Sequence, residues 1–335
     1  MKAVVAALAA NLGIAIAKFA AFLITGSASL LAESVHSVAD SANQVLLLVG
    51  RIRSRREETV EHPFGFGAER YVYAFVVAVI LFVVGAIFSL YEGVTRIRHP
   101  ESVVSPVVAF AVLGVAIVLE AFSFRTAIKE SDRSRGPASW RAFIRHAKAP
   151  ELPVVLLEDF AALIGLGFAL AAVVLTTVTG NGRWDGAGSL AIGVLLGCVA
   201  AVLAVEMKSL LVGESATLEI QRSIVAAIDS TVGIERVIHL RTLHVGPESL
   251  LVAAKVAVAR EATAEAIASA IDEAERRVRG AVPIAGLIFL EPDLYQAAKL
   301  DATDPAVRAA TGARSARKNR AGGATRLPRR DKPLP

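Results

Sequence analysis

Cysteine is almost absent from this chain: its 335 residues include one, Cys198, which lies inside an apolar run. A single cysteine excludes a disulfide framework within the chain and a zinc site built from several thiolates. Charged residues make up only 20% of the sequence, and the excess of five positive charges gathers in short loops and in the last twenty residues. That distribution does not indicate nucleic-acid binding. The His-Glu-x-x-His pattern of many metalloproteases is also absent.

In place of charge, the sequence has long apolar runs, with 54% hydrophobic residues and a mean hydropathy of +0.55. About 20 mostly apolar residues suffice to cross the roughly 30 Å hydrocarbon core of a bilayer. Six such segments predict an all-α domain of six transmembrane helices in an integral, multi-pass membrane protein. The first is too long for the core of a signal peptide and is interpreted as a mature span. The segments cover about residues 3–25, 28–50, 72–91, 106–124, 152–177 and 189–211.

Basic residues are distributed unequally between the two sets of loops. Cytoplasmic loops of membrane proteins carry the excess of lysine and arginine. The loops after the second and fourth spans hold Arg51, Arg53, Arg55, Arg56, Arg70, Arg125, Lys129, Arg133, Arg135, Arg141, Arg145 and Lys148, whereas the opposite loops hold Arg96, Arg98 and Arg183. We therefore expect both termini in the cytoplasm, with the spans in the cell membrane.

The pattern changes after residue 212, where the apolar runs become short. Residues 218–230 and 263–279 have helical patterns, and residues 236–245, 250–257 and 286–290 have strand patterns. The order αββαβ predicts a small α+β, ferredoxin-like cytoplasmic domain over residues 213–295. The basic remainder, residues 296–335, is too poor in apolar residues to fold, so we expect a disordered tail that is either solvated or touches anionic lipid.

Four polar residues interrupt the second span: Glu33, His36, Asp40 and Asn43. Their spacing of three, four and three places them on one stripe of a helix. Ionisable groups in a bilayer are costly and must face protein or water. His36 and Asp40 lie one turn apart and offer the nitrogen and oxygen donors that suit zinc, manganese, iron or cobalt.

The fifth span supplies two adjacent acids, Glu158 and Asp159, which point about 100° apart on a helix. We expect Asp159 to be a third metal ligand. Glu158 is a fourth ligand, a proton acceptor or the partner of a cation. The alternative is that these groups form buried ion pairs that only fasten helices together. Lys18 in the first span, which shares a face with Asn11, could pair with Glu33 or Glu158, and Glu120 in the fourth span is expected to be structural.

Two stretches of sequence carry a family resemblance. Residues 27–50, with the run Leu-Leu-Ala-Glu-Ser-Val-His-Ser-Val-Ala-Asp-Ser-Ala-Asn-Gln, and the loop His-Pro-Phe-Gly-Phe-Gly-Ala-Glu-Arg at residues 62–70 resemble the cation diffusion facilitators. The resemblance covers about residues 1–293. It implies a homodimer that exports zinc or a related divalent ion in exchange for protons, with two ligands from span two and two from span five. The first two map onto His36 and Asp40.

The chain also departs from the common family pattern. Asp159 matches the aspartate of the His-x-x-x-Asp motif in span five, but Val155 stands at the position of the histidine. The sequence Val-Leu-Leu-Glu-Asp resembles the mitochondrial zinc transporter branch, in which Glu158, Asn43 or water completes the ligand set. His62 remains in the loop, while Phe66 replaces a second histidine. The cytoplasmic domain offers His239, His244, Glu291 and Asp293 as further donors.

We therefore expect a divalent cation transporter rather than an enzyme, with the metal held by His36, Asp40 and Asp159, and by Glu158 or Asn43. No prosthetic group is expected. Zinc is the expected cargo, with manganese, iron, cobalt and nickel open, and protons are the expected counter-ion. The partners are the lipid bilayer and a second copy of the chain. The alternatives are a membrane scaffold that transports nothing and an intramembrane metalloenzyme.

Overall fold

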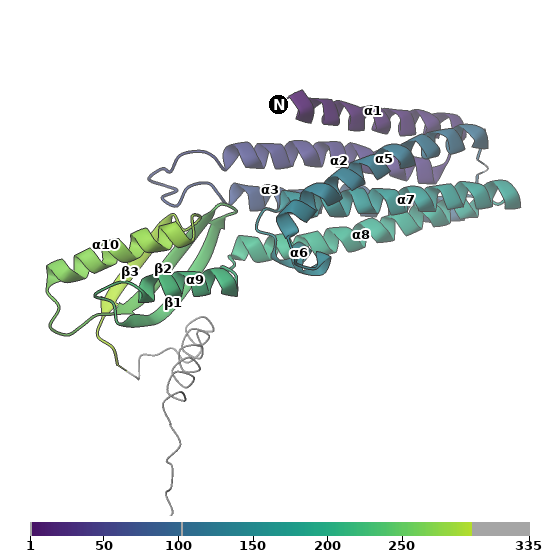
Figure 1. Cartoon of the computed structure of the whole chain (residues 1–335). Coiled ribbons are helices and arrows are strands. Elements are labelled where there is room, and N and C mark those ends of the chain that lie inside the picture. The colour runs from purple at the N-terminus through teal and green to yellow at the C-terminus, as the bar shows by residue number, and fades with distance from the viewer. Residues whose placement is uncertain (1, 102, 297–335) are drawn as a thin grey trace, which may run out of the picture. The chain divides into compact units, whose positions relative to one another are not determined.

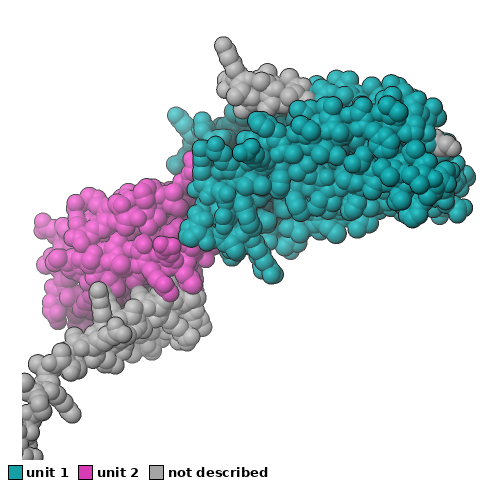
Figure 2. Space-filling view, turned by 45° about the vertical axis from the view of Figure 1, so that its right-hand side comes forward, with its two compact units in different colours: residues 1–212 teal, residues 213–335 magenta. Residues whose placement is uncertain are grey.

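The computed structural model describes residues 2–101 and 103–296, with the backbone alone for residues 2–10. The chain forms two compact units that meet between Val212 and Gly213, coloured separately in Figure 2. All but the first residue of the predicted basic tail lies outside the described residues.

The first unit is a bundle of long helices that lie side by side (Figure 1). Segments α3, η1 and α4 follow one another without a break, so that the chain from residue 69 to residue 98 is one continuous helix with a π-helical segment in its middle. The elements are α1 (Lys2–Thr25), α2 (Ala28–Arg53), α3 (Glu69–Ile80), η1 (Leu81–Ile87), α4 (Phe88–Arg98), α5 (Pro106–Arg135), α6 (Trp140–His146), α7 (Glu151–Thr179) and α8 (Arg183–Val212).

Four helices in the described part of the chain are long and apolar enough to cross a membrane: residues 69–98, α5, α7 and α8. Helix α2, with 26 residues, is also long enough. Its polar and charged residues, however, make its mean hydropathy lower than that of these four helices. Large apolar side chains point away from the bundle, among them Val118, Phe122 and Val178, which are 68%, 72% and 79% exposed. Exposed apolar side chains of this kind are expected on a surface that contacts lipid rather than water. The predicted all-α membrane domain is confirmed.

Small residues allow the helices of this unit to approach closely. A Cβ atom at Gly93 of α4 would lie 2.7 Å from the backbone nitrogen of Leu190 in α8, and one at Gly193 of α8 would lie 2.8 Å from that of Leu90. Close approach through small residues is a common way of packing membrane helices. Helices α4 and α8 therefore pack with their backbones close together.

The second unit is a three-stranded sheet with two helices. Strand β1 (Arg236–Gly246) pairs antiparallel with β2 (Ser249–Ala257), which pairs parallel with β3 (Leu287–Asp293). Helices α9 (Leu218–Asp229) and α10 (Ala264–Ala281) pack against each other and against the sheet. The buried residues alternate along β2, as expected for a sheet with one covered face. The predicted αββαβ order is confirmed.

The ends of the helices differ from the sequence prediction mainly where a helix continues beyond its apolar part into helical turns that carry charged residues. The third predicted span, residues 72–91, is part of a helix over residues 69–98, and the fourth continues to Arg135 instead of ending near residue 124. Hydropathy measures only the apolar length, whereas a helix continues as long as its backbone hydrogen bonds do. The short helix α6 was not predicted, because seven residues carry too little periodicity.

Candidate metal centre

The polar stripe of α2 lies inside the bundle. Glu33, His36 and Asn43 have no exposed surface, and the side chain of Asp40 is 16% exposed. Helix α2 packs against α1, α7 and α8, and the three-four-three spacing keeps the stripe on the inner side of the helix. Of the two surroundings that the sequence left open for these side chains, protein or water, the structure shows protein.

Several donor and acceptor atoms of this stripe have no hydrogen-bond partner within the described residues. They are both ring nitrogens of His36, Oδ1 of Asp40 and Oδ1 of Asn43. His36 Nδ1 lies 3.4 Å from Asp40 Oδ1, close enough for an electrostatic contact. An unsatisfied buried polar group costs about 1–3 kcal/mol, so a group of such atoms on one stripe indicates a site for a ligand.

Helix α7 brings both of its acids into the interior, and they diverge as their adjacent positions require. Glu158 Oε1 accepts a hydrogen bond of 2.7 Å from Asn43 Nδ2, whereas Asp159 Oδ2 accepts one of 2.9 Å from Ser123 Oγ of α5. Glu158 therefore points toward α2 and Asp159 toward α5. Ser123 was not among the predicted site residues, although it lies three residues after Glu120 and so shares a helix face with it.

Lys18 of α1 is fully buried beside the stripe. Its ammonium donates to Glu33 Oε2 at 3.2 Å and to Ser37 Oγ at 2.8 Å, and it lies 3.9 Å from Glu120 Oε1. Of the two partners that the sequence left open for Lys18, the structure selects Glu33. The expected structural role of Glu120 has support in this ion pair, which links α5 to α1.

The resulting cluster is rich in acidic side chains. Asp40 interacts electrostatically with Glu158, Asp159, Glu120 and Lys18. With Glu33, five carboxyl groups from three helices share one ammonium. Carboxyl groups at this depth must be balanced by cations, protons or hydrogen bonds. The cluster is therefore suited to binding a cation, protons or both.

The expected ligands do not converge on one point in this conformation. Among residues 2–101 and 103–296, no three His, Cys, Asp or Glu side chains lie close enough together to hold a metal ion. His36 and Asp40 form a pair, but the hydrogen bonds to Asn43 and Ser123 hold Glu158 and Asp159 in other directions. Side chains of α2 and α7 would therefore have to move before one ion could contact ligands from both helices.

The four donors expected in the second unit do not form a cluster either. Lys255 of β2 contacts Glu291 Oε1 at 3.0 Å and Asp293 Oδ2 at 3.6 Å. The hydrogen bond that the Lys255 ammonium donates to Glu291, together with the negative charge of Glu291, raises the pKa of Lys255. A lysine ammonium thus takes the place of a metal ion beside these two carboxylates.

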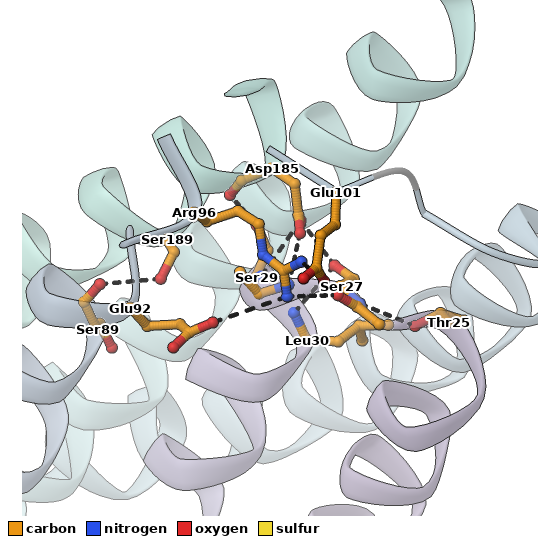
Figure 3. Close-up of polar contacts among 12 residues, drawn as sticks. Thr25, Ser27, Ser29, Leu30, Ser89, Glu92, Arg96, Glu101, Asp185 and Ser189 are labelled. Carbon is orange, nitrogen blue, oxygen red and sulfur yellow. Dashed lines mark hydrogen bonds and ion pairs between the residues drawn. The ribbon is translucent and has the colours of Figure 1, made fainter. Parts of the chain in front are cut away.

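A second polar cluster surrounds Asp185 in the first turn of α8 (Figure 3). Its carboxylate accepts hydrogen bonds from Ser27 Oγ at 2.7 Å and from the backbone nitrogens of Ala28 and Ser29 at 2.5 and 3.2 Å. Ser29 Oγ in turn donates to the backbone oxygen of Asp185 at 2.8 Å. A carboxylate is thus placed on the first turn of α2, where free N–H groups and the helix dipole favour negative charge.

Arg96, in the last turn of α4, belongs to the same end of the bundle. It donates to the backbone oxygen of Gly26 at 2.8 Å and pairs with Glu101 and Glu92 (Figure 3). The sequence had counted Arg96 as a loop charge, but its residue is 8% exposed. Asp185 and Arg96 therefore fix the α1–α2 turn, and neither role could be found from spacing along one helix.

The opposite end has its own link, between α3 and α7. The Arg70 guanidinium donates to both Glu151 oxygens, at 2.5 and 2.8 Å. Such two-point pairing fixes orientation more strongly than a single contact. Each end of the helix bundle is thus tied by buried or half-buried polar contacts, with the candidate metal centre between them.

Comparison with known proteins gives a consistent result. A family model described as the cation efflux transmembrane domain matches residues 4–212. A mitochondrial proton-coupled zinc antiporter, SLC30A9, of Xenopus laevis is 38% identical over 201 residues, which are 59% of this chain and 36% of the relative. Metal tolerance protein C4 of Arabidopsis thaliana is 33% identical over 64% of this chain and 47% of its own length. The chain thus spans about a third to a half of these relatives.

Structures of the C-terminal domain of MamM are also similar, with 23% identity over 23% of this chain and 98% of theirs and a TM-score of 0.22. The family match is independent of that likeness, since it covers well over half of the chain and contains the whole first unit apart from its first three residues. The chain therefore belongs to the cation efflux family, the cation diffusion facilitators.

Proposed function

We propose that this protein is a zinc transporter that exchanges a zinc ion for protons at the polar stripe of α2. The observation that carries the proposal is the set of buried atoms without a hydrogen-bond partner on His36, Asp40 and Asn43, on the stripe from which Asn43 contacts Glu158 of α7. Imidazole nitrogen and carboxylate oxygen are ordinary zinc donors. The names of the relatives, which describe proton-coupled zinc antiporters, agree with this choice of cargo.

The proposed ligands are His36, Asp40 and Asp159, completed by Glu158 or Asn43. In the described conformation His36 and Asp40 are already paired on one turn, while the acids of α7 are held by Asn43 and Ser123. Zinc arriving at the stripe would draw the carboxylates of α7 away from these hydrogen bonds. The carboxyl groups and His36 must be deprotonated to bind the ion, so protons entering from the other side would displace it.

The proposal includes an arrangement in the membrane. Residues 1–212 would cross the bilayer six times, with both termini in the cytoplasm and the basic loops on that side. Residues 213–295 would form a cytoplasmic domain, and the active form would be a homodimer. The membrane is either the cell membrane, as the sequence suggests, or an organellar one, as the mitochondrial relatives suggest.

A flux assay tests the proposal. The purified chain would be placed in liposomes with a zinc-sensitive dye inside and a proton gradient across the membrane, and zinc entry would be recorded together with lumenal pH. We expect zinc flux that depends on the gradient, and its loss to the background of empty liposomes in Asp40→Ala and in Asp159→Ala. Asp132→Ala is the matched control, because that carboxylate lies 46% exposed at the end of α5 and pairs with Arg135.

Two results would overturn the proposal. If the wild-type chain moved no zinc under any gradient, its cargo would be something else. If zinc flux persisted in both Asp40→Ala and Asp159→Ala, the site would lie elsewhere in the chain.

A further inference from the structure

We propose that Lys18 is a built-in counter-charge that sets how tightly the metal centre holds its cargo. The inference rests on the proposed zinc transport and goes beyond it, because Lys18 is not a ligand and acts through its charge. The observation behind it is the position of one fully buried ammonium beside the carboxyl groups of Glu33 and Glu120, next to the turn of α2 that carries His36.

The ammonium is held at a fixed place. Three N–H groups are available on a lysine, and three oxygens lie around Nζ: Ser37 Oγ at 2.8 Å, Glu33 Oε2 at 3.2 Å and Glu120 Oε1 at 3.9 Å. Ser37 directly follows His36, so the ammonium is tied to the same turn as the proposed nitrogen ligand. Lys18 also interacts electrostatically with His36 and Asp40.

The charge cannot move to water without a movement of helices. The stem of Lys18 lines an apolar groove between α1 and α5 with a volume of about 520 Å³. Its other walls are made by Gly13, Ile14, Ala17, Ala111, Val112, Val115, Ala116 and Leu119. An ammonium that left its three oxygens for this groove would lose its partners without gaining new ones, which is strongly unfavourable. The positive charge therefore stays beside the centre while α1 packs against α5.

A fixed positive charge has a definite effect on a bound cation. It neutralises one of the five carboxylates and repels a divalent ion, so it lowers the affinity of the cluster for zinc. A transporter needs this moderation, because a cargo that binds too tightly is not released. Lys18 would thus keep the zinc affinity of the centre in the range where zinc can both bind and be released.

A purely mechanical role makes a different prediction. If Lys18 only fastened α1 to α2 and α5, removing either partner of the Lys18–Glu33 pair would loosen the centre in the same way. Both single variants would then bind zinc more weakly or without change. A charge effect instead shifts the affinity in opposite directions for the two partners.

The experiment measures zinc dissociation constants by titration calorimetry on the full-length chain in detergent at one pH. We expect Lys18→Gln to bind zinc about tenfold more tightly or better, and Glu33→Gln to bind it about tenfold more weakly. The double variant Lys18→Gln with Glu33→Gln removes both charges together and should stay within about threefold of wild type. It also removes the ammonium and its Glu33 partner together, so that Glu33 is not left buried without its counter-charge.

Transport gives a second reading on the same variants. In liposomes, Lys18→Gln should show a lower KM together with a lower maximal rate, because release becomes slow. Lys18→Arg keeps the charge and should remain near wild type in both KM and maximal rate.

The inference is overturned if the zinc dissociation constants of both single variants shift in the same direction, if that of Lys18→Gln shifts by less than about threefold, or if that of the double variant departs from wild type by about tenfold. A wild-type chain that binds no zinc would overturn the proposed function itself, and this inference with it.

Discussion

His36 is the one nitrogen donor among the proposed ligands, and this sets the metal preference at the scale of a single residue. Replacing imidazole by carboxylate leaves only oxygen donors, which suit harder ions such as manganese. We therefore expect His36→Asp to lower the ratio of zinc to manganese flux by about tenfold or more. Competition between zinc, manganese, iron, cobalt and nickel in the liposome assay measures this ratio.

The control for this change is His62→Asp, which introduces the same carboxylate in the exposed loop between α2 and α3. It should leave the ratio unchanged. An unchanged ratio in His36→Asp as well would mean that His36 does not contact the transported ion, and the ligand set would have to be revised.

Gly165 of α7 lies against the carboxylate of Glu33, and it is a second site for a single-residue test. A Cβ atom at this position would collide with Glu33 Oε1 and lie 3.5 Å from Glu33 Cδ. Glu33 cannot turn away freely, because Lys18 holds its other oxygen at 3.2 Å. We expect Gly165→Ala to destabilise the chain by about 1–3 kcal/mol, as overpacking of a well-packed interior does. The midpoint of thermal unfolding in detergent measures the effect.

Gly167 provides a matched control, since it lies two residues further along the same helix with nothing within 4 Å of an added Cβ atom. Gly167→Ala should be neutral or slightly stabilising, because alanine favours a helix by about 1 kcal/mol over glycine. Equal unfolding midpoints for the two variants would contradict the close contact between Gly165 and Glu33.

The sequence predicted the polar residues of the centre better than their partners. Spacing along one helix is enough to place Glu33, His36, Asp40 and Asn43 on one face, because the helical period is fixed. Which residue of another helix meets that face depends on rotation and packing angle. The contacts of Ser123 with Asp159 and of Lys18 with Glu120 therefore could not be derived from the sequence.

At the scale of elements, the start of α2 depends on a residue more than 150 positions away. Ser27 Oγ accepts a hydrogen bond from Leu30 nitrogen within the helix, while Asp185 binds three further donors of the same turn. An amide in place of this carboxylate would present a donor to at least one backbone N–H group and would remove the charge at the helix N-terminus. We expect Asp185→Asn to destabilise the bundle by about 2–4 kcal/mol, seen as a lower midpoint of thermal unfolding.

Asp132→Asn is the corresponding control, because it makes the same chemical change in a carboxylate that lies partly in solvent beside Arg135. Exposed pairs of this kind contribute about 0–1 kcal/mol. If Asp185→Asn unfolded at the temperature of the control, the carboxylate would not be needed to hold α2 against α8.

Helices and strands could be predicted from the sequence where a periodic pattern continues over enough residues to be recognised. Six apolar runs and the order αββαβ were both visible, since helices and strands impose different periods. The α3–η1–α4 helix was predicted without its π-helical segment, because a π turn has no periodic signal of its own. The cap that Asp185 provides for α2 also escaped prediction, because its two parts belong to different spans.

At the scale of the whole molecule, the two ends of the helix bundle differ in charge. The end with the α2–α3 and α5–α7 loops carries most of the arginines and lysines, while the opposite end is closed by Asp185 and Arg96 through paired contacts. An excess of basic residues in the loops of one side is the signal that orients membrane proteins. The charge asymmetry is therefore the physical basis for the proposed cytoplasmic position of both termini.

The scarcity of cysteine makes this orientation directly testable. In a Cys198→Ala background, which lacks cysteine entirely, Glu57→Cys would place a thiol in the α2–α3 loop and His99→Cys would place one at the opposite end, both at exposed positions. With the chain in the cell membrane, a membrane-impermeant maleimide added to intact cells should label His99→Cys and not Glu57→Cys, and both after permeabilisation. Labelling of Glu57→Cys alone in intact cells would show that the bundle has the opposite orientation in the membrane. Both termini would then lie outside the cytoplasm, which would contradict the proposed orientation.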